Sequence, residues 1–336
     1  MKRDKVSWEI ALSDYRLDRP NSKAALQNVS QRKQGGCLDG GSRNTSSPLT
    51  KKCHFPIFVS AGIGFVSLHP DSSREREEGL GMKREERKVV TIGGGTGQFA
   101  LLSGLRDLEG IEITAVVSMA DSGGSTGRLR DELGILPPGD VLKCILALSP
   151  YHKMARTILL KRFTSDIRLK GHNAGNLLLT VLSDFAGSFP AGIQALVEIL
   201  DVRGRILPVT IDKATLVAEL SDGERIYGQA AINVPQGTQR EKIQDIFLVP
   251  HHADSVSVYP PVIEAINGAE FIIIGPGDLF TSIIPNLIVP GVRDALKETE
   301  ATILYIVNIM TKFGETDHFT GYDFVCKVEE CVGRQV

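Results

Sequence analysis

The sequence predicts an α/β fold: a Rossmann-like three-layer sandwich with a mainly parallel sheet and a small β-rich insertion. Three observations predict it. β-Branched and aliphatic runs stop at glycine-rich turns within residues 89–97, 111–128 and 271–277. Apolar residues at helical spacing follow the first turn, which gives a strand, a turn and a helix in succession. Short β-rich pieces of a different kind fill residues 205–249.

The totals limit the class of protein. The 336 residues, 42% of them hydrophobic, suffice for one large domain or two modest ones. Basic and acidic residues number 38 and 40, so we expect no nucleic-acid partner bound through a broad cationic face. The 5 cysteines lack a C-x-x-C pair and indicate a reducing, cytoplasmic environment rather than disulfides or zinc. No apolar run is long enough for membrane insertion.

Residues 1–81 differ in composition from the rest. They are rich in Ser, Asn, Gln, Gly and Arg, whereas strand and helix patterns follow one another from residue 88 onward. Three interpretations compete: a disordered regulatory arm, a small extra domain, and translation of DNA upstream of the true start codon. We favour the third, because Met82 precedes the first strand and residues 74–79 match a purine-rich ribosome-binding site read in frame. The expected folded domain is 82–336.

The first glycine-rich turn, residues 93–97, follows the β-branched run 89–92 and precedes a helix that contains Phe99 and Leu102. Glycines let backbone N–H groups approach an anion at the positive end of a helix. The turn lacks the third glycine of the dinucleotide motif G-x-G-x-x-G. It predicts a phosphate-binding loop, although a purely structural turn would use the same glycines.

A second strand, residues 111–118, ends at residues 121–128, Asp-Ser-Gly-Gly-Ser-Thr-Gly-Arg. The glycines can form another nest of N–H groups, and Arg128 can bind a phosphate through two N–H groups. Asp121 would repel a phosphate. We therefore expect it to bind a ribose hydroxyl, a sugar hydroxyl or a metal, or else to cap the following helix.

A proline turn, residues 137–140, comes next. Asp140 is predicted to be the N-cap of the apolar helix that follows. Lys143, in the first turn of that helix, can add a positive charge to the pocket, but a lone lysine in the first turn of a helix is more often solvated.

Residues 171–176 open another apolar helix. His172 and Asn173 are therefore expected near its positive end, where they can contact a ligand. A lone histidine is more often a capping or packing residue than a base, and Asn176 is equally ambiguous.

The apolar run 271–274 has the pattern of a central parallel strand covered on both faces, and it ends at a Gly-Pro-Gly turn. Asp278, Thr281 and Ser282 follow, where they can cap the next helix or bind ligand oxygens. Asn308 ends a further predicted strand, residues 301–307. A simple loop asparagine is the alternative there.

Residues 205–249 are expected to form a small antiparallel insertion. Four short β-rich pieces, 206–210, 215–220, 225–227 and 243–249, are separated by turn signals. The Asp-Gly pair at 222–223 is typical of a hairpin.

Taken in order, these motifs resemble the YvcK family, also called gluconeogenesis factors, within the wider group that includes 2-phospho-L-lactate transferase. The resemblance covers about residues 88–325 and none of the first eighty. Family members continue past the position of Val336, so the resemblance implies a chain truncated at its C-terminus. The blocks that carry it are residues 92–97, 121–130, 137–140, 171–178, 275–287 and 308–317.

The resemblance implies two functions. One is non-catalytic binding of a nucleotide sugar of the UDP-N-acetylglucosamine type, with regulation of carbon metabolism, cell-wall synthesis and cell shape. The other is transfer of phospholactate from a guanosine diphosphate carrier to a deazaflavin. We favour the first, because the second loop holds one carboxylate and the transferase needs several acids near the phosphates. An NAD-dependent oxidoreductase ranks last, since the full glycine fingerprint is missing.

The resulting predictions for the site are as follows. No catalytic residue is assigned, no cofactor is certain, and a divalent metal stays open beside the UDP-sugar. A homo-oligomer and regulatory protein partners are also left open. The candidate ligand-binding residues are Gly93, Gly94, Gly95, Thr96, Gly97, Asp121, Gly123, Gly124, Ser125, Thr126, Arg128, His172, Asn173, Asn176, Gly275, Gly277, Thr281, Ser282 and Asn308.

Overall fold

The computed structural model describes residues 57–59, 62–64, 86–164, 169–234 and 240–336. All of them belong to one of the two units of the chain, His54–Val336. Most of the predicted extension, 1–81, lies outside the described residues. The part of it that is described consists of two short antiparallel strands, β1 (Ile57–Val59) and β2 (Gly62–Gly64).

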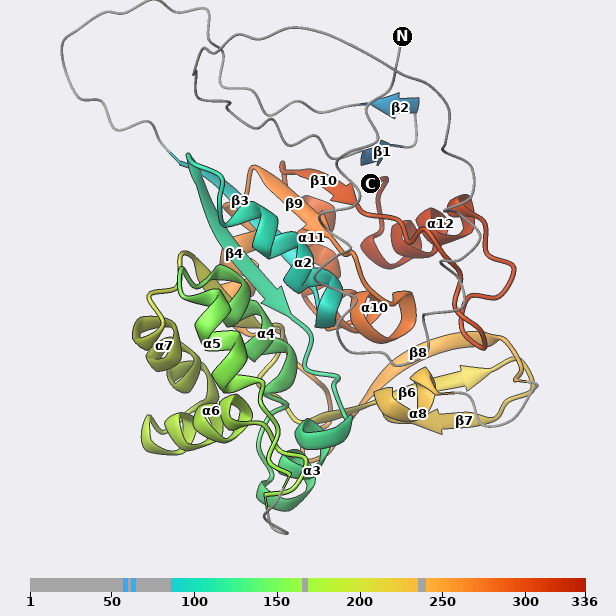
Figure 1. Ribbon diagram of the computed structural model, residues 1–336. Coiled ribbons are helices and arrows are strands. Elements are labelled where there is room, and N and C mark those ends of the chain that lie inside the picture. The colour runs from blue at the N-terminus through green and yellow to red at the C-terminus, as the bar shows by residue number, and fades with distance from the viewer. Residues whose placement is uncertain (1–56, 60–61, 65–85, 165–168, 235–239) are drawn as a thin grey trace, which may run out of the picture. The chain divides into compact units, whose positions relative to one another are not determined.

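A five-stranded parallel sheet forms the centre of the fold, which confirms the predicted α/β class (Figure 1). Its order is β10-β9-β3-β4-β5, and β3 is the middle strand. Val90 of β3 is in register with Thr114 of β4 and with Ile272 of β9. The strands are β3 (Arg87–Gly93), β4 (Ile111–Val117), β5 (Arg205–Pro208), β9 (Phe271–Ile274) and β10 (Thr302–Tyr305).

Helices cover both faces of the sheet. α2 and α4 pack together on one face, and α11 lies on the other (Figure 1). α9 packs against α11. The central strands are apolar on both sides for this reason, and Ile92, Val116 and Ile274 are fully buried. Each such side chain contributes about 1.5–3 kcal/mol to folding through burial. The helices of these layers are α2 (Gly95–Leu105), α4 (Gly139–Leu148), α9 (Pro260–Asn267) and α11 (Val292–Glu298).

The remaining helices surround this core. α6 and α7 pack together as a pair, with α5 beside α6. The turn after β9 is a single wide helical turn, η1 (Leu279–Ile283), that continues into α10 (Ile284–Leu287). The others are α3 (Gly124–Leu133), α5 (His152–Leu159), α6 (Ala174–Phe185), α7 (Phe189–Ile199), α8 (Gln229–Asn233) and α12 (Gly321–Val332). Within the described ranges, no helix has the length and apolar character needed to cross a membrane.

The predicted insertion exists, but its predicted start at 205 is wrong. β5 pairs in parallel with β4 and therefore belongs to the central sheet. β5 is short and has the same apolar character as the strands that follow it in the sequence. Its pattern alone therefore does not show to which sheet it belongs. The antiparallel sheet is β7-β6-β8, formed by β6 (Ala214–Leu220), β7 (Arg225–Tyr227) and β8 (Ile243–Pro250). Gly223, with φ +87°, makes the predicted hairpin turn between β6 and β7.

The strand order reverses beside β3. The chain adds β4 and β5 on one side of β3, then returns to add β9 and β10 on the other. In open α/β sheets, ligands bind at the carboxyl ends of the strands where this reversal occurs. The loops after β3 and β9 flank that point, and the loop after β4 is their neighbour.

Candidate functional site

The loops after β3 and β9 touch through their backbones. A Cβ atom added to Gly97 would lie 2.1 Å from the carbonyl oxygen of Pro276, so only glycine fits there. Ser118 N donates to Gly93 O at 2.9 Å, and Gly275 N donates to Ile92 O at 2.9 Å. These bonds extend the ladder on both sides of β3. The three predicted glycine loops therefore begin at one edge of the sheet, side by side.

Two helices begin in these loops without a side-chain cap. α2 has Gly94 at its N-cap and α3 has Gly123, and neither position supplies a side-chain acceptor. By contrast, Asn173 caps α6 by accepting a hydrogen bond from Asn176 N. Uncapped N–H groups at a helix N-terminus are a site for an anion. The N–H groups in the first turns of α2 and α3 can therefore donate hydrogen bonds to phosphate oxygens.

Asp121 is not the N-cap of α3, which corrects that alternative. Its Oδ1 accepts a hydrogen bond from Gly123 N at 2.9 Å, so it shapes the loop before the helix. Burial and the nearby Asp140 carboxylate raise the pKa of Asp121 above its usual range. The Asp121 carboxylate lies against Gly139, the residue before Asp140. A Cβ added to Gly139 would lie 2.7 Å from Asp121 Oδ2.

Asp140 also departs from its prediction. The N-cap of α4 is Pro138, and the side chain of Asp140, in the first turn, binds Lys143 Nζ at 2.8 Å instead. Of the two alternatives for Lys143, the ion pair favours the one in which it adds a charge beside the glycine loops, although its side chain is still 34% exposed. Asp140 reaches toward the first loop, because a Cβ on Gly94 would lie 2.9 Å from its Oδ2. Helix geometry puts residues three apart on one face, so the pair follows from the early start of α4.

Replacing Asp121 by asparagine is expected to leave the protein equally stable or to stabilise it by roughly 1 kcal/mol or less at pH 7. Asparagine Oδ1 can still accept the Gly123 N–H, while the repulsion from Asp140 disappears. A carboxyl whose pKa is raised on folding loses stability as the pH rises from its ordinary value of 3.8 through the raised one. Urea unfolding at pH 7 and at pH 4 checks this, with a benefit at pH 7 that shrinks at pH 4.

Asp131→Asn is the control. It also removes one negative charge, but from α3 and at a side chain that is 66% exposed. Its effect should be small at both pH values. A clear loss of stability in Asp121→Asn at pH 7 would contradict the assigned repulsion.

The segment before α6 and the first turn of α6 lie against the β4 loop. His172 Nδ1 lies 3.0 Å from Ser125 Oγ, and Asn176 Nδ2 donates to Ser125 Oγ at 3.2 Å and to Thr126 Oγ1 at 3.4 Å. All four side chains are buried. These contacts hold the first turn of α3 to the start of α6 and thereby fix the position of the β4 loop.

Arg128 is turned toward the chain before α6. One of its terminal nitrogens donates to the carbonyl of Lys170 at 2.5 Å. Binding a phosphate through both terminal nitrogens, as the sequence suggested, would require the side chain to leave this partner.

The loop after β9 uses its polar residues differently from the prediction of a helix cap. Asp278 occupies the N-cap position of η1 but makes no capping bond, and its Oδ2 accepts from Lys312 Nζ at 2.7 Å. Thr281 Oγ1 donates to Asn233 Oδ1 at 2.8 Å. Asn286 Nδ2 donates to Ser282 O at 2.8 Å and to Gly93 O at 3.2 Å, which ties this loop to β3.

Two residues of this arrangement were missed from the sequence: Lys312 and Asn233. Lys312 Nζ contacts Asp278, Asn233 Oδ1 at 2.9 Å and Glu315 Oε1 at 2.8 Å. Its only sequence signal was its position inside the block 308–317, and Asn233 had none. Asn308 follows β10 at the same edge, but within the described part of the chain its side chain has no hydrogen bond to the other loops.

Glu315 is the most buried acid of this group, with a side chain that is 1% exposed. Its Oε1 forms an ion pair with Lys312 Nζ at 2.8 Å, and Oε2 has no hydrogen-bond partner among the described residues. Burial raises the pKa of Glu315, and pairing with Lys312 opposes that rise only in part. Burial would lower the pKa of Lys312, but its bonds to Asp278 and Glu315 raise it.

Two carboxylates near the glycine loops are candidates for holding a divalent metal. No group of three or more His, Cys, Asp or Glu side chains suited to a metal ion occurs among the residues that the structure describes. Asp121 and Asp140 are a pair of carboxylates beside the glycine loops. Mg²⁺ is commonly bound by one or two carboxylates together with ligand phosphates. The pair therefore fits a metal that arrives with a phosphorylated ligand.

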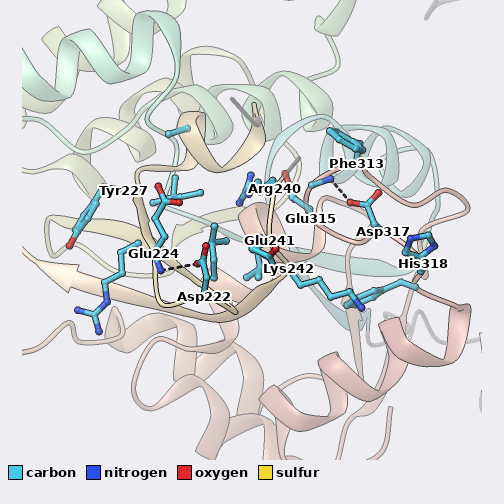
Figure 2. Close-up of a pocket in the computed structure, with 17 residues that line it drawn as sticks. Asp222, Glu224, Tyr227, Arg240, Glu241, Lys242, Phe313, Glu315, Asp317 and His318 are labelled. Atoms are coloured by element: carbon cyan, nitrogen blue, oxygen red, sulfur yellow. Dashed lines mark hydrogen bonds between the residues drawn. The ribbon is translucent and has the colours of Figure 1, made fainter. Parts of the chain in front are cut away.

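A groove of about 1020 Å³ is lined by none of the residues of the glycine loops. In Figure 2, residues of the antiparallel sheet line one side, Phe313, Asp317 and His318 line the other, and Arg240 and Glu315 lie between them. Its walls carry charges of both signs. The uncapped helix ends are at the strand edge instead, so we place the candidate site there.

Comparison with known proteins agrees with these features. The family described as "2-phospho-L-lactate transferase CofD" matches residues 89–336. A Listeria monocytogenes protein named gluconeogenesis factor is 39% identical over 254 residues, which are 75% of this chain and 76% of that protein. A Halalkalibacterium halodurans protein of the same name is 40% identical over 249 residues, with shares of 74% and 75%.

Related proteins also include a longer one and one of known structure. A Nostoc relative is 42% identical over 248 residues, but the chain spans only 53% of its length. A Bacillus halodurans crystal structure, titled as a member of the upf0052 family, matches with a TM-score of 0.70 and 39% identity. The match covers 76% of this chain and 79% of that one.

Proposed function

This chain belongs to the family of the 2-phospho-L-lactate transferase CofD, and we propose that it binds a nucleotide sugar of the UDP-N-acetylglucosamine type without transforming it. The phosphates would lie at the carboxyl ends of β3, β4 and β9. One observation carries the proposal: α2 and α3 begin there with uncapped N-termini on adjacent strands. A diphosphate has two anionic groups, and two neighbouring helix ends match that number.

The proposal gives no catalytic role to the side chains near the loops. His172, Ser125 and Asn176 are buried and bind one another, so they support the fold of the site. Lys143 is engaged by Asp140. The relatives named gluconeogenesis factor support a regulatory role in carbon metabolism. We extend this role, as a proposal, to cell-wall synthesis, cell shape and a cytoplasmic location.

The alternative is a transferase that moves phospholactate from a guanosine diphosphate carrier to a deazaflavin. The acid pair Asp121 and Asp140 favours it, because two carboxylates beside a diphosphate can share a divalent metal with it. The description of the family points the same way. Turnover of the guanosine-linked substrate with a deazaflavin would decide for this alternative.

Gly95→Ala is expected to weaken UDP-N-acetylglucosamine binding at least tenfold. Gly95 has φ +66° and is the first residue of α2. A methyl group there would occupy space that a phosphate oxygen needs beside the N–H groups, and the conformation costs about 1–2 kcal/mol for alanine. Titration calorimetry with the full chain measures the affinity.

Gly110→Ala is the matched control. Gly110 also has a positive φ, +74°, and an added Cβ there meets nothing within 4 Å. It lies before β4, at the opposite edge of the sheet. The control should lose similar stability and keep wild-type affinity. Equal affinity in Gly95→Ala and the wild type would contradict the proposed site.

A further inference from the structure

We propose that Asn233 of α8 is a specificity-determining residue that offers N–H donors, and no acceptor, to the ligand in this crevice. The inference rests on the proposed function, since it assigns a contact within the same site. It concerns a residue outside every glycine loop, on the inserted segment between β7 and β8.

The position of α8 relative to the sheet places it across the crevice. Ala230 N donates to Ser122 Oγ, in the β4 loop, at 3.0 Å. Asn233 Oδ1 accepts from Thr281 Oγ1, in the turn after β9, at 2.8 Å. Because β3 lies between β4 and β9, α8 joins the loops on either side of the β3 glycine loop.

The dimensions agree with this placement once the side chains are counted. Five helical residues span about 8 Å at 1.5 Å each. Two strand spacings amount to about 10 Å. The helix alone is therefore shorter than the distance from β4 to β9, and the side chains of Ser122, Asn233 and Thr281 complete the connection between the two loops.

The orientation of the Asn233 amide is fixed by chemistry. Lys312 Nζ lies 2.9 Å from the amide atom assigned as Oδ1, and an ammonium group can only donate. The atom facing Lys312 must therefore be the oxygen and not the nitrogen. Thr281 donates to the same oxygen. Both hydrogen bonds are accepted by Oδ1, so a rotation of the amide by 180° would break both of them.

The nitrogen of the amide is left for a ligand. Asn233 is half-buried, and within the described residues its hydrogen bonds go to Oδ1 and none goes to Nδ2. Nδ2 therefore keeps two N–H groups to donate. A donor-only group beside two helix N-termini suits an acceptor such as a phosphate oxygen or a carbonyl of the base or sugar.

Lys312 fixes this orientation of the Asn233 amide. Its ammonium also contacts Asp278 and Glu315, so its position does not depend on Asn233 alone. An aspartate at position 233 could keep both hydrogen bonds through one oxygen. Its second oxygen would then present an acceptor and a negative charge where asparagine presents donors.

The test uses the full chain and four probes: UDP-N-acetylglucosamine, UDP, uridine and GDP. Asn233→Asp is expected to bind the diphosphates at least tenfold more weakly than the wild type, with a thermal midpoint close to that of the wild type. Asn233→Ala removes the donors without adding charge and should weaken binding by a smaller factor of about three to ten, equivalent to about 0.6–1.4 kcal/mol. A loss that extends to UDP assigns the acceptor to the nucleotide; a loss confined to UDP-N-acetylglucosamine assigns it to the sugar. Either result supports the contact.

Asn267→Asp is the matched control. Asn267 is exposed and ends α9, which leads into the amino end of β9, so the same charge change occurs at the opposite edge of the sheet. This control should bind like the wild type. Affinities of Asn233→Asp and Asn233→Ala within twofold of the wild type would overturn the inference alone, as would an equal loss in Asn267→Asp. A wild-type chain that binds none of the four probes would overturn both the inference and the proposed function.

Discussion

Gly97→Ala is expected to destabilise the protein by about 3 kcal/mol and to abolish nucleotide-sugar binding. The new Cβ would lie 2.1 Å from the carbonyl oxygen and 2.6 Å from the carbonyl carbon of Pro276. Both are backbone atoms, so no side-chain rotation can relieve the overlap. The β3 and β9 loops would have to separate, which moves the start of α2 away from the turn after β9. Alanine would otherwise favour the helix by about 1 kcal/mol, and the clash exceeds that gain.

Gly321→Ala makes the same substitution at the start of α12, where an added Cβ meets nothing within 4 Å. It should be neutral or stabilise by up to about 1 kcal/mol. Urea unfolding and UDP-N-acetylglucosamine titration of both variants compare the two sites. A Gly97→Ala variant as stable as Gly321→Ala would show that the two loops are not in contact.

Lys312→Met is expected to cost about 3–5 kcal/mol, because it leaves the Glu315 carboxylate buried without its partner. The Glu315 side chain is 1% exposed, and its Oε1 lies 2.8 Å from Lys312 Nζ. Arg240 also faces this carboxylate and offsets part of the loss, while Asp278 adds repulsion. Thermal or urea unfolding at several pH values measures the cost.

The pH dependence has a definite sign. Burial already raises the pKa of Glu315 in the folded protein, and removing Lys312 raises it further. A carboxyl whose pKa is higher in the folded state destabilises the fold as the pH rises from the usual value of 4.5 through the raised one. Lys312→Met should therefore be closest to the wild type at low pH and furthest from it above neutrality.

Two further variants isolate the cause. Glu315→Gln added to Lys312→Met removes the uncompensated charge and should recover most of the lost stability. Lys327→Met breaks the exposed pair with Glu330, whose side chain is 67% exposed, and should cost less than about 1 kcal/mol. Equal losses in Lys312→Met and Lys327→Met would mean that Glu315 does not depend on Lys312.

Sequence patterns predicted the three glycine loops, because a turn at the end of a strand depends on residues that are close together in the sequence. Residues 93–97, 121–128 and 275–277 each follow a strand whose period and composition are visible within a few residues. Glycine at Gly95 and Gly275 reflects a positive φ, which is also a local property. These features were predicted correctly as turns at strand ends.

Other predictions depended on distant partners and were wrong or incomplete. Asp140 resembled a helix cap, yet α4 begins two residues earlier than predicted, and the Asp140 carboxylate pairs with Lys143 instead. β5 resembled its β-rich neighbours, yet it pairs with β4. The bonds that Asn233 makes to Thr281 and Lys312, and the bond from Lys312 to Asp278, each join residues more than thirty positions apart, so no local pattern indicated them.

The sequence by itself determined the α/β class, the family and the three glycine loops, since these follow from short-range periodicity and from residue types that only certain backbone conformations accept. The tertiary structure decided which groups meet. It brought α8 across the β3 loop, set Asp121 against Asp140 and fixed the Asn233 amide through Lys312. The physical reason is that hydrogen bonds and charge pairs between distant segments depend on sheet order and helix packing, which no local pattern encodes.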